Sequence, residues 1–272
     1  MVWTRGAPVA LLIFMAVAVL VPAAEVLRVS LLDASGGFTL DHYQQVLGDP
    51  YLVSSLLATL AFCAGTSIAA TLLALPAAWR IGRGGRGARY LRAFCQANYA
   101  FGGIAYGMLV VTLIGNVGLV PLAEGALFGT EATKGIAYTI PGLIIAYFGF
   151  QIPRAALLLA QAVEKLDPRL LDAARTLGAR PFQTTWMVVL PLLRGALMST
   201  ALSTFLISLG SFGVALLVSR KLTIYAVVIY KEFLGYSEFG TATAMAVILS
   251  ASALLAALAA RRLNGSSDKA RI

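Results

Sequence analysis

The sequence is poor in charged residues and in the side chains that bind metals or form disulfides. Charged residues make up 12% of its 272 residues, which is about half the share found in soluble domains. The single histidine, His42, cannot form a metal site alone and is expected in a solvated loop. The two cysteines, Cys63 and Cys95, show neither a disulfide framework nor metal-ligand spacing. We therefore predict no catalytic residues, no metal and no cofactor.

Apolar residues are abundant instead, at 59% of the sequence, and the mean hydropathy is +0.84. They gather in six segments of about the length that crosses a bilayer. The pattern predicts an all-α membrane protein with six transmembrane helices in a single domain, 1–272. The predicted spans are residues 8–27, 51–79, 93–120, 135–163, 193–218 and 240–260.

The net charge of +9 could indicate a nucleic-acid partner, but the basic residues alternate with the apolar segments, which is a topology signal. With the N-terminus in the cytoplasm, 15 lysines and arginines fall inside and 5 outside. We therefore predict that both termini are cytoplasmic and that no nucleic acid binds. The arginine- and glycine-rich segment 80–92 is expected to be a flexible positive-inside anchor, and the alternative is contact with anionic lipid head groups.

The longest polar interruption in the C-terminal half is the segment 164–191. Asp167 can cap a helix and Pro168 fits the first helical position, so residues 169–177 are predicted to form a short helix. Gly178 stands where a left-handed residue would end that helix. A second short helix is expected to start near Pro181 and to run into residues 188–191. The segment is thus predicted to be a helical elbow rather than a flexible linker.

The elbow resembles the E-A-A-x3-G-x9-I-x-L-P loop of permease subunits in binding-protein-dependent ABC importers, the MetI-like family. Asp172 replaces the glutamate and Val188 replaces the isoleucine, while the order and spacing are intact. The resemblance extends over about residues 39–263. In that family the loop docks into a groove on the ATPase subunit, which implies an ATPase-coupling role here. The matching residues are Asp172, Ala173, Ala174, Gly178, Val188, Leu190 and Pro191.

This resemblance implies a MetI-like fold and a permease subunit, not an enzyme, in a bacterial inner (plasma) membrane. The subunit would form half of the path for a small solute. Because the sequence has no Walker A motif, the implied partners are two ATP-binding cassette subunits, a second permease, identical or homologous, and an extracytoplasmic solute-binding protein, all in membrane lipid. The segment 80–92 could also touch the ATPase. Permeases for polyamines, ferric iron, phosphonates, sulfate and thiamine look most similar, and the sequence does not choose among these solutes.

Two other classes of protein remain as alternatives. One is an ATPase-independent membrane channel or scaffold subunit. The other is a membrane-embedded enzyme, which would need paired catalytic groups near the membrane, whereas Arg154 is the only charge that lies more than a few residues from the end of a predicted span. The first span is also open to interpretation, because its apolar core, 9–21, and the following Pro22–Ala23–Ala24 resemble a cleavable signal peptide. The family resemblance favours retention of this helix.

Glycines are frequent in the third predicted span, where Gly103 and Gly107 form a G-x-x-x-G pattern. Small residues let helices approach closely where no water is present to drive association. The pattern is short and common. It therefore predicts a close helix contact without naming its partner.

Two features of the predicted spans suggest a translocation path. Serines and threonines fill one half of the fifth span, where they must meet either a neighbouring helix or water. Arg154 follows Pro153 in the fourth span, about 15 Å from the cytoplasmic boundary. It either snorkels or has a structural partner, or it attracts anions in the path. The path candidates are Arg154, Thr200, Ser203, Thr204, Ser208 and Ser211.

Overall fold

The structure is a computed structural model that describes residues 3–33, 36–220, 222–235 and 238–269. In this part of the chain the regular structure is helical, apart from one isolated β-bridge between Leu32 and Phe38. Six helical segments of the described residues are long and apolar enough to cross a membrane, which confirms the predicted all-α class and the six spans. The segments are Leu11–Ser30, Pro50–Leu73, Gly103–Phe128, Ile140–Glu164, Phe182–Leu209 and Phe239–Arg262.

The chain separates into two compact units. The smaller comprises residues 1–56 and 225–252, and the larger comprises residues 57–224 and 253–272. Two long helices, α3 (Pro50–Leu73) and α14 (Phe239–Lys269), contribute to both units. The single domain 1–272 therefore stays a prediction.

The smaller unit also holds α1 (Trp3–Ser30), α2 (Asp41–Gly48) and α13 (Tyr225–Leu234). His42 lies in α2, which matches the short surface helix that the sequence predicts over residues 41–47, and it is half-buried rather than solvated as expected. Its Nε2 is 3.2 Å from the carbonyl oxygen of Leu32. Its ring packs so tightly on Gly240 that a Cβ there would lie 2.2 Å from the ring. The buried residues of this core are Val46, Leu52, Tyr225, Val228, Ala244 and Met245.

The larger unit is built around α8, the most buried of the membrane-length helices in the described chain. Small side chains from α4, α5 and α8 form the core, so these helices approach closely. At Gly82 in α4, a Cβ would lie only 2.8 Å from the carbonyl oxygen of Ala160 in α8. The helices of this unit are α4 (Leu75–Arg83), α5 (Ala88–Ala100), α6 (Gly103–Ile114), α7 (Leu119–Phe128), η1 (Ile136–Tyr138), α8 (Ile140–Glu164), α9 (Pro168–Thr176), α10 (Pro181–Thr184), η2 (Thr185–Val189), α11 (Leu190–Leu209) and α12 (Phe212–Val218).

The arginine-rich segment 80–92 is structured rather than flexible. It contains the end of α4, a tight turn with glycines at positive φ, and the start of α5. Arg92 forms an ion pair with Glu164 at the end of α8. The glycines therefore form the tight turn of a helical hairpin that packs against α8. A high glycine content is equally typical of a flexible linker, so the sequence did not predict this turn.

Three predicted spans have different bounds in the structure. The range 51–79 is interrupted after Leu73, near Pro76, because proline lacks the N–H that a continuous helix needs there. The range 93–120 begins inside α5, which ends at an extended Phe101, so the membrane-length segment is Gly103–Phe128. The range 193–218 is divided at 210–211 into α11 and α12. A hydropathy average does not register such short breaks.

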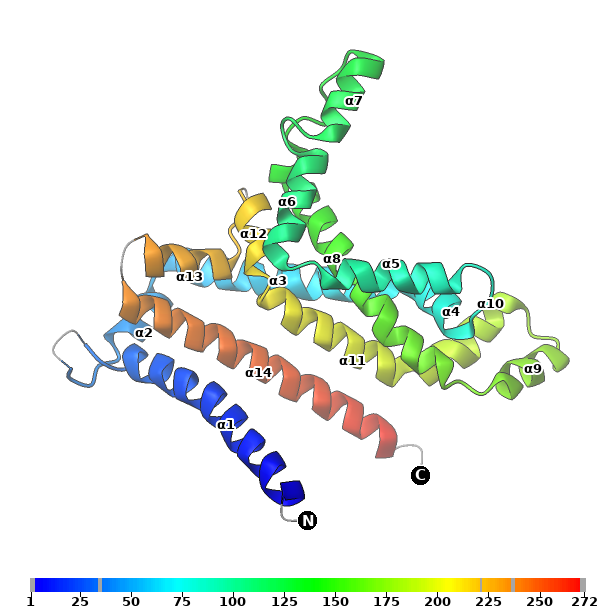
Figure 1. The fold of residues 1–272 in the computed structure, drawn as a ribbon, viewed down its shortest axis with the longest axis horizontal. Coiled ribbons are helices and arrows are strands. Elements are labelled where there is room, and N and C mark those ends of the chain that lie inside the picture. The colour runs from blue at the N-terminus through cyan, green and yellow to red at the C-terminus, as the bar shows by residue number, and fades with distance from the viewer. Residues whose placement is uncertain (1–2, 34–35, 221, 236–237, 270–272) are drawn as a thin grey trace. The chain divides into compact units, whose positions relative to one another are not determined.

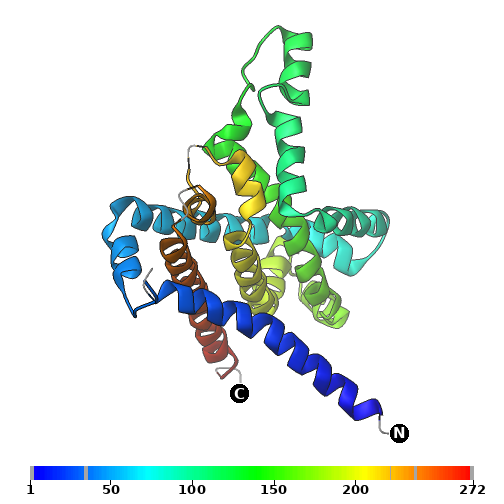
Figure 2. The same ribbon diagram turned by 60° about the vertical axis from the view of Figure 1, so that its left-hand side comes forward.

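Helix α12 packs against α6, and the two lie side by side in both views (Figures 1 and 2). A Cβ at Gly213 would lie 2.5 Å from the backbone nitrogen of Ile104, and one at Gly107 would lie 3.2 Å from the carbonyl oxygen of Gly213. The G-x-x-x-G pattern of α6 therefore makes the close helix contact that the sequence predicted, and the partner is α12.

Candidate functional site

The elbow between α8 and α11 has the local geometry that the sequence predicted. The Asp167 carboxylate caps α9 by accepting a hydrogen bond of 2.9 Å from the Arg169 N–H, and Pro168 occupies the first helical position. Gly178 has a φ of +80°, a backbone angle that only glycine adopts without steric cost. The elbow therefore begins and ends its first helix at fixed residues.

Two hydrogen bonds hold the turn at the end of α9. The Gly178 N–H donates to the Arg175 carbonyl oxygen at 2.9 Å, and the Ala179 N–H donates to the Ala174 carbonyl oxygen at 3.0 Å. This pair is the Schellman motif, which satisfies carbonyls that a helix end leaves free. The direction in which α10 leaves α9 is thus set by backbone bonds at one glycine.

The junction between the elbow and α11 is a π-helical turn, η2. The Leu190 N–H donates to the carbonyl oxygen of Thr185, five residues back. Pro191 follows at the first turn of α11; it has no N–H, and in a regular helix its ring would clash with the carbonyl four residues earlier. The wider π turn accommodates this ring. Such turns are frequent at functional sites.

A small apolar core fixes the elbow to the ends of α8 and α11, beyond which it forms a bend (Figure 1). Val163 of α8, Val189 of η2 and Leu193 of α11 are buried in this core. Leu171 of α9 and Trp79 of α4 pack against them, partly buried. Both arms of the elbow are thereby attached to the helices that they join.

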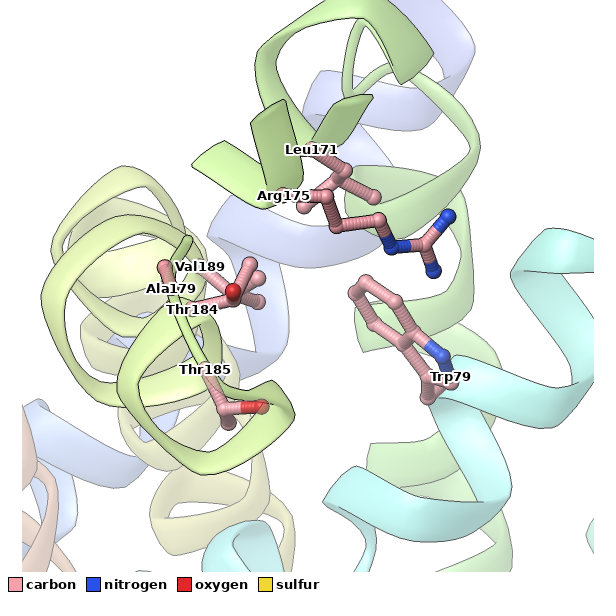
Figure 3. Close-up of a pocket in the computed structure, with 7 residues that line it drawn as sticks. All are labelled: Trp79, Leu171, Arg175, Ala179, Thr184, Thr185 and Val189. Carbon is pink, nitrogen blue, oxygen red and sulfur yellow. The ribbon is translucent and has the colours of Figure 1, made fainter. Parts of the chain in front are cut away.

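A cavity of about 230 Å³ lies between the elbow and α4. Figure 3 shows Arg175 beside the ring of Trp79 on one side and Thr184, Thr185 and Val189 on the other. The elbow therefore does not close fully onto α4, and space remains beneath the π turn. Leu171 and Ala179 complete the lining.

The outer surface of the elbow carries large apolar side chains. Leu177 is 87% exposed, Phe182 is 71% exposed and Met187 is 76% exposed. Phe182 and Met187 belong to the membrane-length segment Phe182–Leu209, whereas Leu177 lies outside it, so its exposed apolar side chain is available to another protein. Asp172 and Ala173 are also exposed.

The remaining motif residues have structural contacts. Ala174 is buried, Val188 and Leu190 are half-buried, and Pro191 is exposed at the start of α11. Asp172 lies 3.4 Å from the guanidinium of Arg175 in an exposed pair, which is weak in water. Asp172 is also the fifth residue of α9, beyond the first turn where the helix dipole acts. Its carboxylate is thus held only loosely within the elbow.

The serines and threonines of the fifth predicted span differ in their burial and in their contacts. Thr200, Thr204, Ser208 and Ser211 are buried. Thr204, Ser208 and Ser211 donate hydrogen bonds of 2.7 to 2.9 Å to carbonyl oxygens four residues earlier. Ser203 instead lines a groove between α8 and α11, and Thr200 reaches the same groove.

Gln151 is a buried polar residue that sequence reasoning missed. Its Nε2 donates to Ser208 Oγ at 2.5 Å and to Thr66 Oγ1 at 3.3 Å, which ties α8 to α11 and α3. Ser67 Oγ lies 3.4 Å from Ser208 Oγ. The polar face of α11 at Ser208 thus packs against α3 and α8. The sequence offered one sign of this contact: Gln151 is an isolated polar residue in an apolar span, one helical turn before Arg154.

Arg154 is 7% exposed and contacts the end of α5. Its guanidinium donates to the carbonyl oxygens of Phe150, Tyr99 and Phe101 at 2.6, 3.2 and 3.5 Å. It also stacks on the rings of Phe150 and Tyr99, at 3.6 and 4.7 Å from their centroids. These contacts agree with the structural-partner interpretation, in which the partners are carbonyls and rings rather than a carboxylate.

The chain is similar to known transport proteins in both its sequence and its fold. The model of the family described as "Binding-protein-dependent transport system inner membrane component" matches residues 67–267. The sulfate transport system permease protein CysW of Synechocystis sp. is 28% identical over 212 residues, 75% of each chain. The trehalose transport system permease protein SugB of Mycobacterium tuberculosis is 27% identical over 217 residues, 78% of this chain and 73% of SugB.

Solved structures give the same fold. A chain of the bacterial alginate ABC transporter, in complex with an alginate pentasaccharide-bound periplasmic protein, aligns over 96% of this chain and 95% of its own length. The TM-score is 0.74 at 17% sequence identity. At this identity the likeness concerns the fold alone.

Proposed function

Because this chain belongs to the family of binding-protein-dependent transport system inner membrane components, we propose that it couples a solute path to ATPase subunits through the 164–191 elbow. In this proposal the chain is the permease subunit of an ATP-driven ABC importer and forms half of the path. The observation that carries the proposal is the elbow itself, a rigid Schellman turn at Gly178 beside exposed Leu177 and Phe182. The family resemblance supports the proposal, because the motif residues Ala174 and Gly178 flank Leu177 in the sequence.

The partners follow from this role. Two ATPase subunits would bind the elbows of this chain and of a second permease, identical or homologous. An extracytoplasmic binding protein would deliver the solute; the alginate transporter forms a complex with an alginate pentasaccharide-bound periplasmic protein. The elbow and both termini would then face the cytoplasm, with ATP hydrolysed by the separate subunits.

Closure of the two ATPase subunits on ATP would displace α9. The Schellman turn and the small apolar core beneath the elbow would transmit that displacement to η2 and α11. Pro191 and the π turn would be the place where the elbow and α11 change their mutual angle, and the 230 Å³ cavity beside Trp79 gives the elbow room to move. Movement of α11 would switch the path between outward and inward access.

Co-purification of an ATPase tests the proposal. The tagged chain, expressed with its native partners, is captured from detergent-solubilised membranes and ATPase activity is measured in the eluate. Leu177→Ser removes an exposed apolar side chain from the elbow, and Leu47→Ser, at a residue 62% exposed in α2, is the matched control. We expect co-eluting ATPase to fall about tenfold in the first variant only, as loss of an anchor residue at an interface predicts.

The alternative is an ATPase-independent channel or scaffold subunit. It would be favoured if no ATPase co-elutes with the unaltered chain. Equal co-elution in both leucine variants would contradict a contact at the elbow.

A further inference from the structure

We propose that the groove between α8 and α11 is a solute-contact site that favours small oxyanions over cations. The groove has a volume of about 260 Å³. It lies beside the ends of α8 and α11 that the elbow joins, so it would form the cytoplasmic part of the path. The inference rests on the proposed function, because it concerns the solute of that path. The lining residues are Leu158, Gln161, Ala162, Lys165, Ala196, Ser199, Thr200 and Ser203.

Four polar side chains of the lining have no hydrogen bond within the described chain: Gln161, Lys165, Thr200 and Ser203. In contrast, Ser199 donates to the Ala196 carbonyl oxygen at 3.0 Å. Polar groups beside a membrane core must meet water or a polar partner. An ammonium, two hydroxyls and an amide that all face one groove are therefore available to a passing solute.

The charge of the lining decides the class of solute. Lys165 has no ion pair among the described residues, and no carboxylate lines the groove. The neighbouring acid, Glu164, is paired with Arg92. Ammonium and hydroxyl groups donate strong hydrogen bonds to oxyanions, whereas a cation would meet uncompensated positive charge. The groove thus disfavours polyamines.

Arg154 does not supply this selectivity. It is buried, and its guanidinium nitrogens donate to backbone carbonyls. The groove charge belongs to Lys165, at the end of α8. A single substitution can therefore remove the selectivity without disturbing a buried contact.

Charge-selective labelling of Ser203→Cys in the assembled complex tests the proposal. Rates are measured for an anionic and a cationic methanethiosulfonate, each divided by its rate with a free thiol. We expect the normalised rate to be about tenfold higher for the anionic reagent, because an unpaired unit charge that lines a groove raises the local concentration of an oppositely charged reagent. Lys165→Gln should bring the ratio near one, and Lys231→Gln, a lysine of α13, should leave it unchanged.

The two native cysteines should react only slowly with these reagents. Cys63 and Cys95 are buried, and burial raises the pKa of the Cys95 thiol, so little reactive thiolate forms. If Ser203→Cys does not assemble, Ser199→Cys on the same groove takes its place, because Ser199 is exposed.

Protection from labelling identifies the solute class directly. Inorganic sulfate serves as the oxyanion probe, spermidine as the cation and trehalose as the neutral solute. Slower labelling with sulfate alone would support the proposal. A normalised ratio near one in the parent variant, or protection by spermidine, would overturn it.

The outcome is separable from that of the proposed function. ATPase co-elution should be the same with Ser203→Cys as with the unaltered chain, because Ser203 lies in α11, outside the elbow. The effect of Leu177→Ser on ATPase co-elution tests the proposed function of the elbow. The effect of Lys165→Gln on the labelling ratio tests the proposed solute selectivity of the groove.

Discussion

Replacing Gly178 with valine should uncouple the elbow without disturbing membrane insertion. Gly178 has a φ of +80°, and a Cβ built there meets nothing within 4 Å. The cost of a side chain is therefore conformational and not steric. For a residue other than glycine that cost is roughly 1–2 kcal/mol, and it is larger for a β-branched side chain.

The energetic cost translates into a loss of the native turn. A penalty of about 1.4 kcal/mol changes a conformational equilibrium tenfold. The valine variant should therefore form the two Schellman hydrogen bonds, of 2.9 and 3.0 Å, about tenfold less often relative to competing turns. Because these bonds set the direction of α10, the exposed Leu177 and Phe182 would no longer lie in the orientation that an ATPase groove recognises.

A series of substitutions at position 178 distinguishes the effect of the backbone conformation from the effect of side-chain size. Asparagine tolerates the left-handed region better than other residues with a side chain, so Gly178→Asn should retain more function than Gly178→Ala, and Gly178→Val should retain least. Uptake into proteoliposomes and ATPase co-elution are measured for each variant, with membrane yield as the control for insertion. We expect normal yield, near-complete loss of uptake in the valine variant and weakened ATPase association.

Two results would refute this reasoning. Uptake at the unaltered level in Gly178→Val would show that the turn does not transmit the ATPase movement. Equal losses in the asparagine and valine variants would show that φ is not the controlling variable.

Other variants test separate parts of the structure. Asp172→Ala should reduce uptake less than Gly178→Val does, because Asp172 makes only an exposed pair and its loss leaves the turn in place. Arg154→Met removes hydrogen bonds to three carbonyl oxygens, each worth about 1.5–3 kcal/mol when the donor is charged. The melting temperature of the complex in detergent should therefore fall. An unchanged melting temperature with lost uptake would favour the path role of Arg154 instead. Gly82→Val should destabilise by about 1–3 kcal/mol through overpacking against α8, whereas Gly195→Val, where nothing lies within 4 Å, should melt within a few degrees of the unaltered chain. For topology, a cysteine at exposed Arg86 should react with impermeant reagents only from the cytoplasmic side; the other expected position, Ser35, lies outside the described residues.

The elbow could be predicted because its signals are local. The cap at Asp167, the proline after it and the left-handed glycine all act within about ten residues of the chain, and the structure places each in its expected conformation. The number of spans could be predicted for a similar reason, since a bilayer demands a run of apolar residues of fixed length. The π turn at Thr185–Val189 was not predicted, although Pro191 was its local cause.

Contacts between distant segments could not be predicted. Arg154 looked anomalous because its partners, the carbonyls of Tyr99 and Phe101, are more than fifty residues away. Gln151 carried no pattern of its own, yet it joins three helices. The breaks beside Phe101 and Gly210 also fall within apolar runs, where composition alone suggests a continuous helix.

The sequence by itself determined the helical class, the six membrane-length segments, the family and the local shape of the elbow, because hydropathy, capping and glycine φ depend on neighbouring residues. Only the tertiary structure decided which polar residues of α11 pack and which stay open. Thr204 and Ser203 are adjacent in sequence but point about 100° apart on the helix, and here the first is buried while the second lines the groove between α8 and α11. Periodicity identifies a polar face, and the neighbouring helices determine which part of that face stays open.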